Sequence, residues 1–522
     1  MSYEYNLGIR FHAIASAHAR RTALWFSENQ SVTYEELNAQ SNRIGRWLLD
    51  RGIRKGDLVC LSESKAGLVF AALIACLKIG AIYCFLDPDS PVERLRKILV
   101  TCKPKLLLAE VALLRKLERI AAEMTIPATD KDDVSFLDGI RKCDGSNLPD
   151  VHTVTGEDAA YVMYTSGSTG FPKGAVITHA NVLNLTEWSQ ETYRISQEDI
   201  LTNVNPLYFD NSVFDIYSSL LTGACLVPFS KEEVTDPGLL VAKVDAARCT
   251  LWFSVPSLLI FLQTMKAMDG KHLRSIRRFI FGGEKYPKVK LKKLYDIYSD
   301  SSQLFNVYGP TECTCICSSY KITGDDLRDL HGLPPLGRIA GNFSFLILDD
   351  HGKRVSDGEV GELFLLGSNV GKGYYNDPLR TAESFVQNPY NTNFREVMYK
   401  TGDLVRMNPG DGKLYIHGRK DNQIKHMGYR IELEEVEAAM HLLDYVAEAV
   451  ALHSDINGMS RIVAVVASGK KFEDDEIRRD LRRIIPDYMI PSVFHRADLL
   501  PKNPNGKVDR LQLAETYLRR ES

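Results

Sequence analysis

The sequence predicts an α/β protein with a large N-terminal domain of helix-flanked parallel sheets, a β-rich subdomain and a small α+β C-terminal domain. The chain has 522 residues, which is too many for a single core. Its first two-thirds alternates helical stretches with short apolar runs, the pattern typical of parallel sheets covered by helices. A change of pattern near residue 420 predicts two domains, 1–420 and 421–522.

Helices and strands alternate from the start of the chain. Between Tyr34 and Asp50, apolar side chains recur at the spacing of one helix face. The next stretches predict a strand over 58–61, a helix over 65–78 and a strand over 81–86. This order is what a sheet of parallel strands needs, because each strand returns through a helix.

The later part of the chain has a different pattern. From 341 to 366, short strands are separated by turns, which predicts the β-rich subdomain. Beyond 421 the sequence predicts a helix over 434–443, a strand over 461–467 and a helix over 475–485. These elements are enough for a small separate domain.

The composition is that of an ordinary globular protein, with 44% apolar and 25% charged residues. Lys and Arg total 64 against 67 acidic residues, so bulk charge gives no support for binding to nucleic acid or a membrane surface. The start of the chain lacks a basic and apolar leader, and the apolar run 68–77 is too short to span a membrane. A cytoplasmic enzyme is the simplest expectation.

The ten cysteines stand mostly in apolar runs, as reduced core residues do. Cys313, Cys315 and Cys317 alternate along the chain, so a strand there would place all three side chains on one face. Structural zinc sites favour Cys-x-x-Cys spacing, and no second Cys or His pair with that spacing accompanies these three. We therefore predict a strand that lines a pocket rather than a metal site.

A phosphate-binding loop is predicted at Tyr161–Gly174, where a short apolar strand runs into a stretch rich in glycine and hydroxyl groups. Glycines allow backbone N–H groups to approach an anion closely. The stretch lacks the Gly-Lys-Ser/Thr ending of a Walker loop. An ordinary solvated turn is the alternative. The polar candidates are Thr165, Ser166, Gly167, Ser168, Thr169 and Lys173.

Further motifs stand in a fixed order on both sides of this loop, between about residues 33 and 510. They are Thr33-Tyr-Glu-Glu-Leu37, Leu77-Lys-Ile-Gly-Ala-Ile-Tyr83, Phe209-Asp-Asn-Ser212, Asn306-Val-Tyr-Gly-Pro-Thr-Glu312, Gly361-Glu-Leu363, Gly373-Tyr374, Tyr399-Lys-Thr-Gly-Asp-Leu404, Gly418-Arg-Lys-Asp-Asn-Gln-Ile-Lys425, Pro486-Asp-Tyr-Met-Ile-Pro491 and Asn505-Gly-Lys-Val-Asp-Arg510. Together with the loop, these motifs resemble the adenylate-forming superfamily, and most closely the amino-acid adenylation domains of nonribosomal peptide synthetases and their free-standing relatives.

The resemblance implies that a substrate carboxylate attacks the α-phosphate of ATP and expels magnesium pyrophosphate. Such a site must position two anions and neutralise their charge. Lys507 matches the family's catalytic lysine, although its local sequence alone would favour a solvated turn. Asp421 matches the hinge of a mobile C-terminal lid. The residues that match nucleotide or Mg²⁺ positions are Asn306, Tyr308, Gly309, Thr311, Glu312 (the metal ligand), Asp403, Arg419 and Lys425.

Asp210 matches the residue that pairs with the substrate's α-amino group in amino-acid-activating members of the family. An aspartate there argues for an amino acid, because a buried carboxylate without a partner is costly. The other matched pocket positions are mostly apolar and carry no second charge, so we expect a small or cyclic aliphatic substrate such as proline or alanine. They are Asn211, Phe214, Phe253, Ile280, Gly282, Val307, Cys315 and Ile316.

Two departures from the family pattern bear on the second step of the reaction. His426-Met427 stands where the family usually has Ile-Arg, so a basic residue that could face the partner is missing. The sequence ends twelve residues after Arg510, which leads us to expect a separate carrier protein with a phosphopantetheine arm. The competing functions are a coenzyme A ligase for a non-amino acid and a catalytically silent nucleotide-binding protein, although the latter should have lost Lys507, Glu312 or Asp403.

Overall fold

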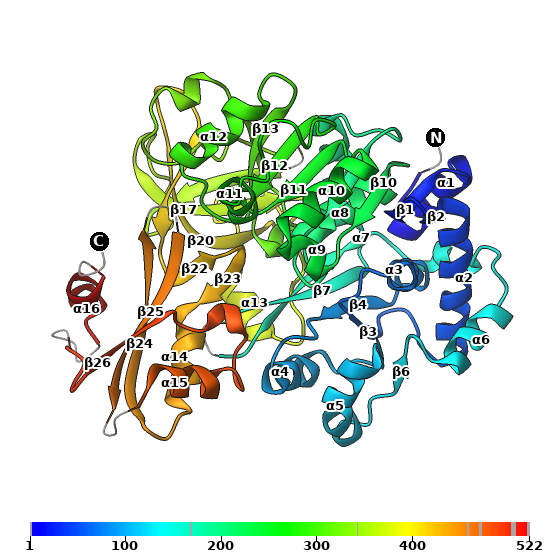
Figure 1. Ribbon diagram of the computed structural model, residues 1–522, viewed down its shortest axis with the longest axis horizontal. Helices are drawn as coiled ribbons and strands as arrows, with labels where there is room; N and C mark the ends of the chain where they lie inside the picture. Colours follow the sequence, from blue (N-terminus) through cyan, green and yellow to red (C-terminus); the bar gives the residue numbers. More distant parts are fainter. Residues whose placement is uncertain are drawn as a thin grey trace. The chain divides into compact units, whose positions relative to one another are not determined.

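The computed structural model describes residues 3–167, 170–341, 343–456, 459–468, 472–502 and 508–518 (Figure 1). The chain divides into two units. The first comprises Met1–Pro88, Cys102–Met163 and Gly174–Lys420. The second comprises Asp421–Ser522 together with two shorter stretches, Asp89–Thr101 and Tyr164–Lys173. The sequence did not predict those two stretches as parts of the C-terminal unit.

Two mixed sheets with largely parallel strands form most of the first unit, which confirms the predicted fold class. Strands β2, β14, β15 and β18 pair antiparallel with their neighbours. The larger sheet has the order β15 (Arg338–Ile339), β14 (Ser318–Lys321), β13 (Gln303–Tyr308), β12 (Arg278–Gly282), β11 (Leu251–Ser254), β9 (Ile200–Asn203), β10 (Cys225–Pro228), β1 (Thr22–Ser27), β2 (Gln30–Thr33). The other has the order β18 (Gly373–Tyr374), β8 (Lys173–Thr178), β7 (Ala159–Thr165), β4 (Ile82–Leu86), β3 (Leu58–Ser62), β5 (Leu106–Ala109), β6 (Ala128–Asp130).

Helices cover both sheets of the first unit (Figure 1). Helices α2, α3, α7 and α8 share one apolar cluster with strands of both sheets, while α10, α11 and α12 cover the other face of the larger sheet. The α-helices are α1 (Leu7–Ala17), α2 (Tyr34–Asp50), α3 (Gly67–Ile79), α5 (Val111–Glu123), α6 (Val134–Lys142), α7 (His179–Tyr193), α8 (Asn211–Leu220), α9 (Lys231–Thr235), α10 (Pro237–Ala247), α11 (Pro256–Thr264), α12 (Lys288–Tyr298) and α13 (Pro378–Ser384). Short 3-10 helices lie at η1 (Pro149–Thr153), η2 (Thr311–Cys313) and η3 (Asp325–Leu327).

Helix α2 spans the predicted residues, and its start has a local cause. Thr33 accepts a hydrogen bond from the Glu36 backbone, and the Glu36 side chain accepts one from the Thr33 backbone. This capping box satisfies N–H groups that the first helical turn leaves unpaired. The neighbouring helix α3 has no polar face and is buried along almost its whole length. The Lys78 ammonium near its end donates to Asn38, Ser41 and Asn42 of α2, and burial lowers its pKa.

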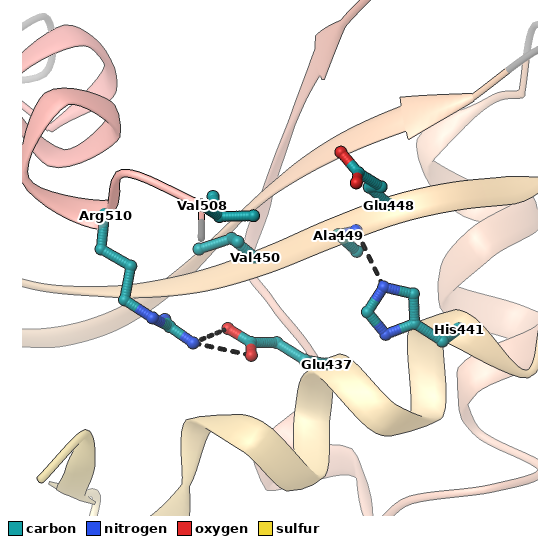
Figure 2. A pocket seen from close by; sticks show the side chains of 7 residues that line it. All are labelled: Glu437, His441, Glu448, Ala449, Val450, Val508 and Arg510. Carbon is teal, nitrogen blue, oxygen red and sulfur yellow. Dashed lines mark hydrogen bonds and ion pairs between the residues drawn. The ribbon is translucent and has the colours of Figure 1, made fainter. Parts of the chain in front are cut away.

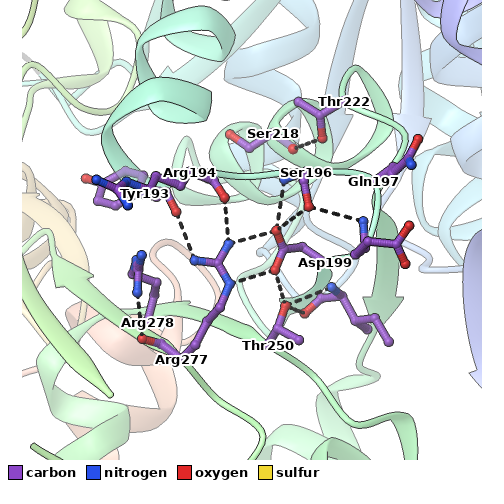
Figure 3. A network of polar contacts seen from close by, with 12 residues as sticks. Tyr193, Arg194, Ser196, Gln197, Asp199, Ser218, Thr222, Thr250, Arg277 and Arg278 are labelled. Carbon is purple, nitrogen blue, oxygen red and sulfur yellow. Dashed lines mark hydrogen bonds and ion pairs between the residues drawn. The ribbon is translucent and has the colours of Figure 1, made fainter. Parts of the chain in front are cut away.

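A buried ion pair ties the start of β12 to the loop before β9 (Figure 3). The Arg277 guanidinium donates to both Asp199 carboxylate oxygens, at 2.8 and 2.7 Å, and to the backbone carbonyls of Tyr193 and Arg194 at the end of α7. Thr250 donates to Asp199 as well. The Tyr193 ring then packs edge-on against Phe214 of α8. The network therefore fixes the end of α7 beneath the first turn of α8.

The β-rich subdomain is an antiparallel sheet, as the short strands predicted. Its order is β16 (Phe343–Leu348), β17 (Val360–Gly367), β20 (Val397–Met407) and β19 (Phe385–Gln387), and β21 (Leu414–Arg419) also pairs with β20. One face packs on a cluster that contains Tyr308 and Tyr399. The long strand β20 thus carries the predicted nucleotide residue Asp403 next to β13.

The second unit contains a small hairpin and a three-stranded sheet (Figure 1). Alternate residues of β24 and β25 face α14 and α15 on one side and α16 on the other. The hairpin turns at Met427 and Gly428, whose φ angles of 51° and 84° are those of a tight primed turn. The elements are α4 (Val92–Cys102), β22 (Gln423–His426), β23 (Tyr429–Glu432), α14 (Leu433–His441), β24 (Val446–Ile456), β25 (Met459–Ser468), α15 (Asp474–Leu481), η4 (Asp487–Met489), β26 (Val493–Ala497) and α16 (Arg510–Tyr517).

Two predictions about local structure were wrong. Helix α15 ends at Leu481 instead of continuing to Ile485, because the last turn tightens, with the Ile484 N–H donating to the Leu481 carbonyl before Pro486. The cysteine run 313–317 is not a strand. Thr314 and Cys315 have left-handed φ angles of 61° and 70°, so the alternation is broken and Cys315 joins a different apolar cluster from Cys313 and Cys317.

Candidate functional site

Asp403, a predicted nucleotide residue, lies in β20, and side chains of the first unit donate hydrogen bonds to both of its carboxylate oxygens. The Tyr308 hydroxyl donates to Oδ2 at 2.5 Å, and Arg419 of β21 donates to Oδ1 at 2.7 Å. Arg419 also donates to the Thr401 carbonyl. Burial and the nearby Asp403 charge raise the pKa of Tyr308, so its phenol stays protonated and remains a donor. Three predicted nucleotide residues are thus one hydrogen-bonded group.

Strand β13 and the turn after it carry further residues that the sequence predicts to bind the nucleotide. The Asn306 amide nitrogen donates to the Pro335 carbonyl at 2.8 Å. This contact fixes the orientation of the Asn306 side chain, whose own amide oxygen can accept a hydrogen bond. A side chain at Gly309 would meet the Cys315 carbonyl oxygen at 2.1 Å. Only glycine therefore allows the two backbone segments to lie this close. Tyr308 packs in the apolar cluster beneath, so its ring is part of the core as well.

Asp210, Thr311 and Glu312 lie close together in the first unit. The Thr311 hydroxyl donates to Asp210 Oδ2 at 2.6 Å. The next residue, Glu312, is fully buried, and one of its carboxylate oxygens accepts from the Tyr374 hydroxyl at 2.7 Å. Asp210 stands at the N-cap position of α8 and is only partly buried. The carboxylates of Asp210 and Glu312 therefore stand on either side of Thr311, whose hydroxyl contacts the first and whose backbone precedes the second.

The predicted pocket residues gather in the cluster between the two sheets. Phe253 of β11 contacts Phe214 of α8 edge-on, with ring centroids 5.0 Å apart. Its neighbour Trp252 faces the opposite side of the sheet, so the strand's alternation selects Phe253 for this cluster. A side chain at Gly282 would meet the Val307 carbonyl oxygen at 2.4 Å. The members of the cluster among the predicted residues are Phe214, Phe253, Ile280, Val307, Cys315 and Ile316.

The described part of the predicted phosphate loop contacts acidic residues within the second unit. The Lys173 ammonium lies 3.2 Å from the Glu432 carboxylate, and the Gly167 N–H donates to Glu435 at 3.3 Å. The Ser166 hydroxyl accepts from the Glu432 N–H and donates to the Arg430 carbonyl. Carboxylate oxygens of the C-terminal stretch therefore occupy donors that the sequence assigns to phosphate oxygens.

Two cations of α4 complete this cluster in the second unit. Arg94 pairs with Glu435, and both side chains are buried. Lys97 donates to the Gly170 carbonyl at 2.7 Å. The sequence analysis did not identify Arg94, Lys97, Glu432 and Glu435. A charged residue on a helix or strand does not indicate which distant residue it will contact. Tyr374 could have been found, since Gly373-Tyr374 was already part of the motif set.

Several predicted residues have other outcomes. Lys507, Ser168 and Thr169 lie outside the described residues. Asp421, the predicted hinge, accepts from the Gln423 N–H at 3.3 Å, and Lys425 is half-buried in β22. His426, a departure from the family pattern, contacts the Ser460 hydroxyl through Nδ1 at 2.8 Å, and His453 contacts the same hydroxyl at 2.8 Å. His426 thus ties the β22–β23 hairpin to β24 and β25.

The described part of the chain contains neither a cluster of metal-binding side chains nor a membrane-spanning helix. Within it, no group of three or more His, Cys, Asp or Glu side chains is arranged to hold a metal ion. No helix there is both long enough and apolar enough to cross a bilayer.

Comparison with known proteins shows the family. The profile of the AMP-binding enzyme family matches residues 11–375, and that of the AMP-binding enzyme C-terminal domain matches residues 435–507. The chain belongs to the AMP-binding enzyme family, and it is an adenylate-forming ligase of the nonribosomal peptide synthetase type, as the motifs predicted.

Individual relatives agree with this assignment, and a solved structure shares the fold. The chain is 34% identical to a dimodular nonribosomal peptide synthase of Bacillus subtilis (strain 168) and 33% identical to bacitracin synthase 1 of Bacillus licheniformis, over 94% and 95% of its length. It spans only 20% and 9% of those two proteins. The structure of holo-PA1221, described as containing adenylation and PCP domains, has a TM-score of 0.83 at 24% identity, covering 98% of this chain and 84% of that one.

Proposed function

We propose that the chain activates an amino acid as its aminoacyl adenylate in the cytoplasm and passes the aminoacyl group to a carrier protein. In the first step a carboxylate oxygen of the amino acid attacks the α-phosphorus of ATP, and the bond to the leaving pyrophosphate breaks. In the second step the thiol of a separate carrier's phosphopantetheine arm replaces AMP at the carbonyl carbon. The protein's own part is to hold and orient charged reactants.

The observation that carries this proposal is the placement of Asp210. It stands at the start of α8, its carboxylate accepts from Thr311, and it precedes by one helical turn Phe214 of the apolar cluster. An ammonium group is the natural partner for a partly buried carboxylate in such surroundings. A substrate without an amine could not form this ion pair with Asp210.

Nucleotide binding is assigned to the bonded group around Asp403. A carboxylate already oriented by Tyr308 and Arg419 retains lone pairs that accept the ribose hydroxyls. The Asn306 carbonyl oxygen is the acceptor for the adenine amino group. Lys173, Ser166 and Gly167 would bind the β- and γ-phosphates after leaving the groups that they contact now.

Glu312 is the proposed magnesium ligand, and its surroundings fit that role. Mg²⁺ binds to proteins through one or two carboxylates and takes its other ligands from water and phosphate oxygens. Tyr374 holds one oxygen of the buried Glu312 carboxylate, which fixes its orientation. When bound, the ion would neutralise phosphate charge.

The lid residues complete the proposal. Lys507 would place its charge between the substrate carboxylate and the α-phosphate, and Asp421 would be the hinge of the C-terminal unit. Arg419 and Lys425 would contact the nucleotide. For the second step, a carrier partner is supported by the structural neighbour, which is described as containing adenylation and PCP domains.

The side chains of the buried cluster favour a small or cyclic aliphatic amino acid. Phe214 and Phe253 narrow the space, and the part of the cluster that the sequence assigned to the pocket contains no charge besides Asp210. Proline and alanine remain the first candidates. A large or charged side chain would have to displace packed aromatic rings.

Amino-acid-dependent exchange of labelled pyrophosphate into ATP tests the proposal. The screen covers the standard amino acids, both alanine enantiomers and β-amino acids, with propionate as the matched control because it is alanine without the amine. We expect exchange with a small or cyclic aliphatic amino acid and not with propionate, and Asp210→Asn should lower kcat/KM for the amino acid about 100-fold. Exchange that depends only on non-amino carboxylic acids would instead indicate an acyl ligase, and no exchange with any acid would contradict the function.

A further inference from the structure

The larger sheet of the first unit contains a point at which its strand order reverses. From β9 the chain passes to β10 on one side and then to β11, which lies on the other side of β9. Strands β9, β11, β12 and β13 are parallel, so their carboxyl ends lie at one edge of the sheet. Ligands of open α/β sheets bind at this edge, beside the strands where the order reverses. A substrate is therefore expected beside the ends of β9 and β11.

The Asn205 side chain joins these two strands at the expected substrate edge. Strands β9 and β11 pair at Leu201 and Leu251, near the start of each strand. Beyond the end of β9, the Asn205 amide nitrogen donates to the Phe253 carbonyl of β11 at 3.0 Å. The same nitrogen donates to Asp215 Oδ2 of α8, also at 3.0 Å. One amide group thus connects β11 with α8.

Asp215 is a buried acceptor for this contact. Its side chain belongs to a residue that is 1% exposed, and the Asn203 amide nitrogen donates to the same carboxylate oxygen at 3.0 Å. Burial raises the pKa of Asp215 to about 8, and the hydrogen bonds from Asn205 and Asn203 and the Lys65 charge oppose that rise. A buried acceptor that loses a donor is costly, because water does not reach it. The folded protein therefore strongly favours the contact between Asp215 and Asn205.

This bridge connects the two aromatic residues that the sequence assigned to the pocket. Phe214 precedes Asp215 in α8, and Phe253 provides the carbonyl that Asn205 contacts. The two rings meet edge-on, with centroids 5.0 Å apart. Phe214 also packs edge-on against Tyr193 at 5.7 Å, so α7 helps to fix its position. Loss of the bridge would leave Phe253 free to shift relative to Phe214.

We propose that Asn205 and Asp215 are positioning residues for substrate selection, which hold Phe253 against Phe214 so that the pocket rejects an amino acid with one methylene group too many. The inference rests on the proposed function, in which both rings line the pocket for the amino-acid side chain. One methylene group in an apolar pocket changes kcat/KM about 10- to 200-fold. Asn205 and Asp215 act on this discrimination through Phe253, without contacting the substrate themselves.

Pyrophosphate exchange with two pairs of amino acids tests this role. The pairs are alanine with 2-aminobutyrate and proline with pipecolate, and the members of each pair differ by one methylene group. The selection ratio is kcat/KM for the smaller member divided by kcat/KM for the larger one. We expect Asn205→Ala to lower the selection ratio about ten-fold, through a lower KM for the larger member, with KM for ATP changed less than about two-fold.

Asn203→Ala is the matched control for Asn205→Ala. Asn203 donates to the same Asp215 oxygen but does not contact the Phe253 carbonyl. Its selection ratio should stay within about two-fold of the wild type. An unchanged ratio in Asn205→Ala, or an equal decrease in both variants, would overturn the proposal. Asn205→Ser keeps at most one of the two contacts and is the milder variant for the same comparison, should Asn205→Ala not fold.

Two further comparisons test whether the effect passes through the bridge. Asp215→Asn keeps an acceptor oxygen for the Asn205 amide and should retain the selection ratio within about three-fold, whereas Asp215→Leu has no acceptor and should lower it about ten-fold. In a Phe253→Ala background, Asn205→Ala should change the ratio less than about two-fold, because the ring through which it acts is absent. Equal effects of Asn205→Ala with and without the Phe253 ring would contradict the role of the bridge.

A buried carboxylate in the second unit separates lost stability from lost selection. Glu437 lies at the wall of a cavity of about 410 Å³ between α14 and β24, and it accepts from Arg510 at 2.7 Å (Figure 2). Glu437→Gln should lower the free energy of unfolding but keep the selection ratio within about two-fold of the wild type, because a loss of active protein affects both members of a pair equally. A lower ratio in Glu437→Gln would show that destabilisation alone weakens selection, against the proposal.

The wild-type chain distinguishes failure of this inference from failure of the proposed function. Exchange with neither pair would refute the proposed class of substrate, and the inference would fall with it. Exchange with one pair and a selection ratio that Asn205→Ala leaves unchanged would refute the positioning role alone.

Discussion

Asp403 in the first unit is the residue that we propose to bind the ribose of ATP. Its carboxylate is buried and is already paired with the Arg419 guanidinium. Removing one partner of a buried pair is expensive, because the remaining charge has lost both water and its counter-ion. A substitution of Asp403 would therefore change both the stability of the fold and the proposed nucleotide binding, and a test must separate these two effects.

Asp403→Asn is expected to lower the free energy of unfolding by about 3 kcal/mol and to raise KM for ATP about ten-fold. The amide keeps the shape but loses the charge that faces Arg419 and one acceptor for ribose. Chemical denaturation and pyrophosphate exchange measure the two effects. Asp199→Asn is the matched control, since Asp199 is paired with Arg277 in a similarly buried network away from the site (Figure 3). Asp199→Asn should lose comparable stability with an unchanged KM for ATP. A raised KM in this control would show that lost stability alone raises KM, so that the result for Asp403→Asn would not indicate a role in nucleotide binding.

Prediction from the sequence placed single residues correctly where residue type and motif spacing pointed to the same position. It failed where an unusual backbone conformation determines which way a side chain points. Phe253 was assigned to the pocket from the family resemblance, and the structure places it in the same buried cluster as Phe214. The side-chain directions of Cys313, Cys315 and Cys317 could not be predicted, because left-handed conformations at Thr314 and Cys315 break the alternation. Such conformations are uncommon in residues other than glycine, so a pattern of side chains gives no hint of them.

At the scale of elements, the stretch 164–173 is bound by β23 and α14 within the second unit. The contacts join Lys173 to Glu432 and Gly167 to Glu435. Phosphate oxygens and these carboxylates would compete for the same donors. In the proposed function, ATP binding would break contacts that the structure now contains, and weakening these contacts should favour the nucleotide.

Glu432→Gln is expected to tighten the binding of inorganic pyrophosphate about two- to five-fold, because the amide releases the Lys173 ammonium at a gain of about 0.5–1 kcal/mol. Inhibition of the exchange reaction by pyrophosphate, or calorimetry, measures the change. Glu434→Gln, two residues further on in the first turn of α14, is the control, since Glu434 contacts the neutral Asn422 side chain. Weaker pyrophosphate binding in Glu432→Gln would mean that the carboxylate supports the loop instead of competing for it.

At the scale of the whole molecule, most of the architecture followed from the sequence. Alternating helices and apolar runs predicted the parallel sheets, and the bounds of α2 were predicted in full because a capping box and regular apolar spacing agree. The contribution of 89–101 and 164–173 to the second unit could not be predicted. It depends on contacts such as Arg94 with Glu435, which are 341 residues apart. The preference of a short sequence stretch for helix or strand does not indicate contacts between residues so far apart in the chain.

Acid sensitivity of the first unit should depend on His179. The ring is fully buried at the start of α7, its Nδ1 accepts from the Leu7 N–H, and burial lowers its pKa from 6.5 to about 4. Between pH 6.5 and 4 the unfolded chain binds a proton that the folded chain does not. The free energy of unfolding should therefore be unaffected by this group above about pH 6.5 and fall by about 3 kcal/mol as the pH drops to about 4.

Urea unfolding at about pH 7, 6 and 5 measures this dependence. His179→Asn should be less stable at neutral pH but should lose the part of the pH slope that belongs to the imidazole. Carboxylates that titrate lower contribute equally to both proteins, so the difference between the two slopes is the informative quantity. Identical slopes would show that another group governs acid unfolding.

The discontinuous second unit limits how the chain can be recombined with its relatives. An exchange of C-terminal parts at residue 421 would transfer Glu432 and Glu435 but leave Arg94, Lys97 and Lys173 behind. Both acids are buried, so a chimera with unmatched partners would have unpaired charges in its interior. Chimeras that also carry 89–101 and 164–173 from the donor should express and fold better, which makes three separate segments the smallest transferable set.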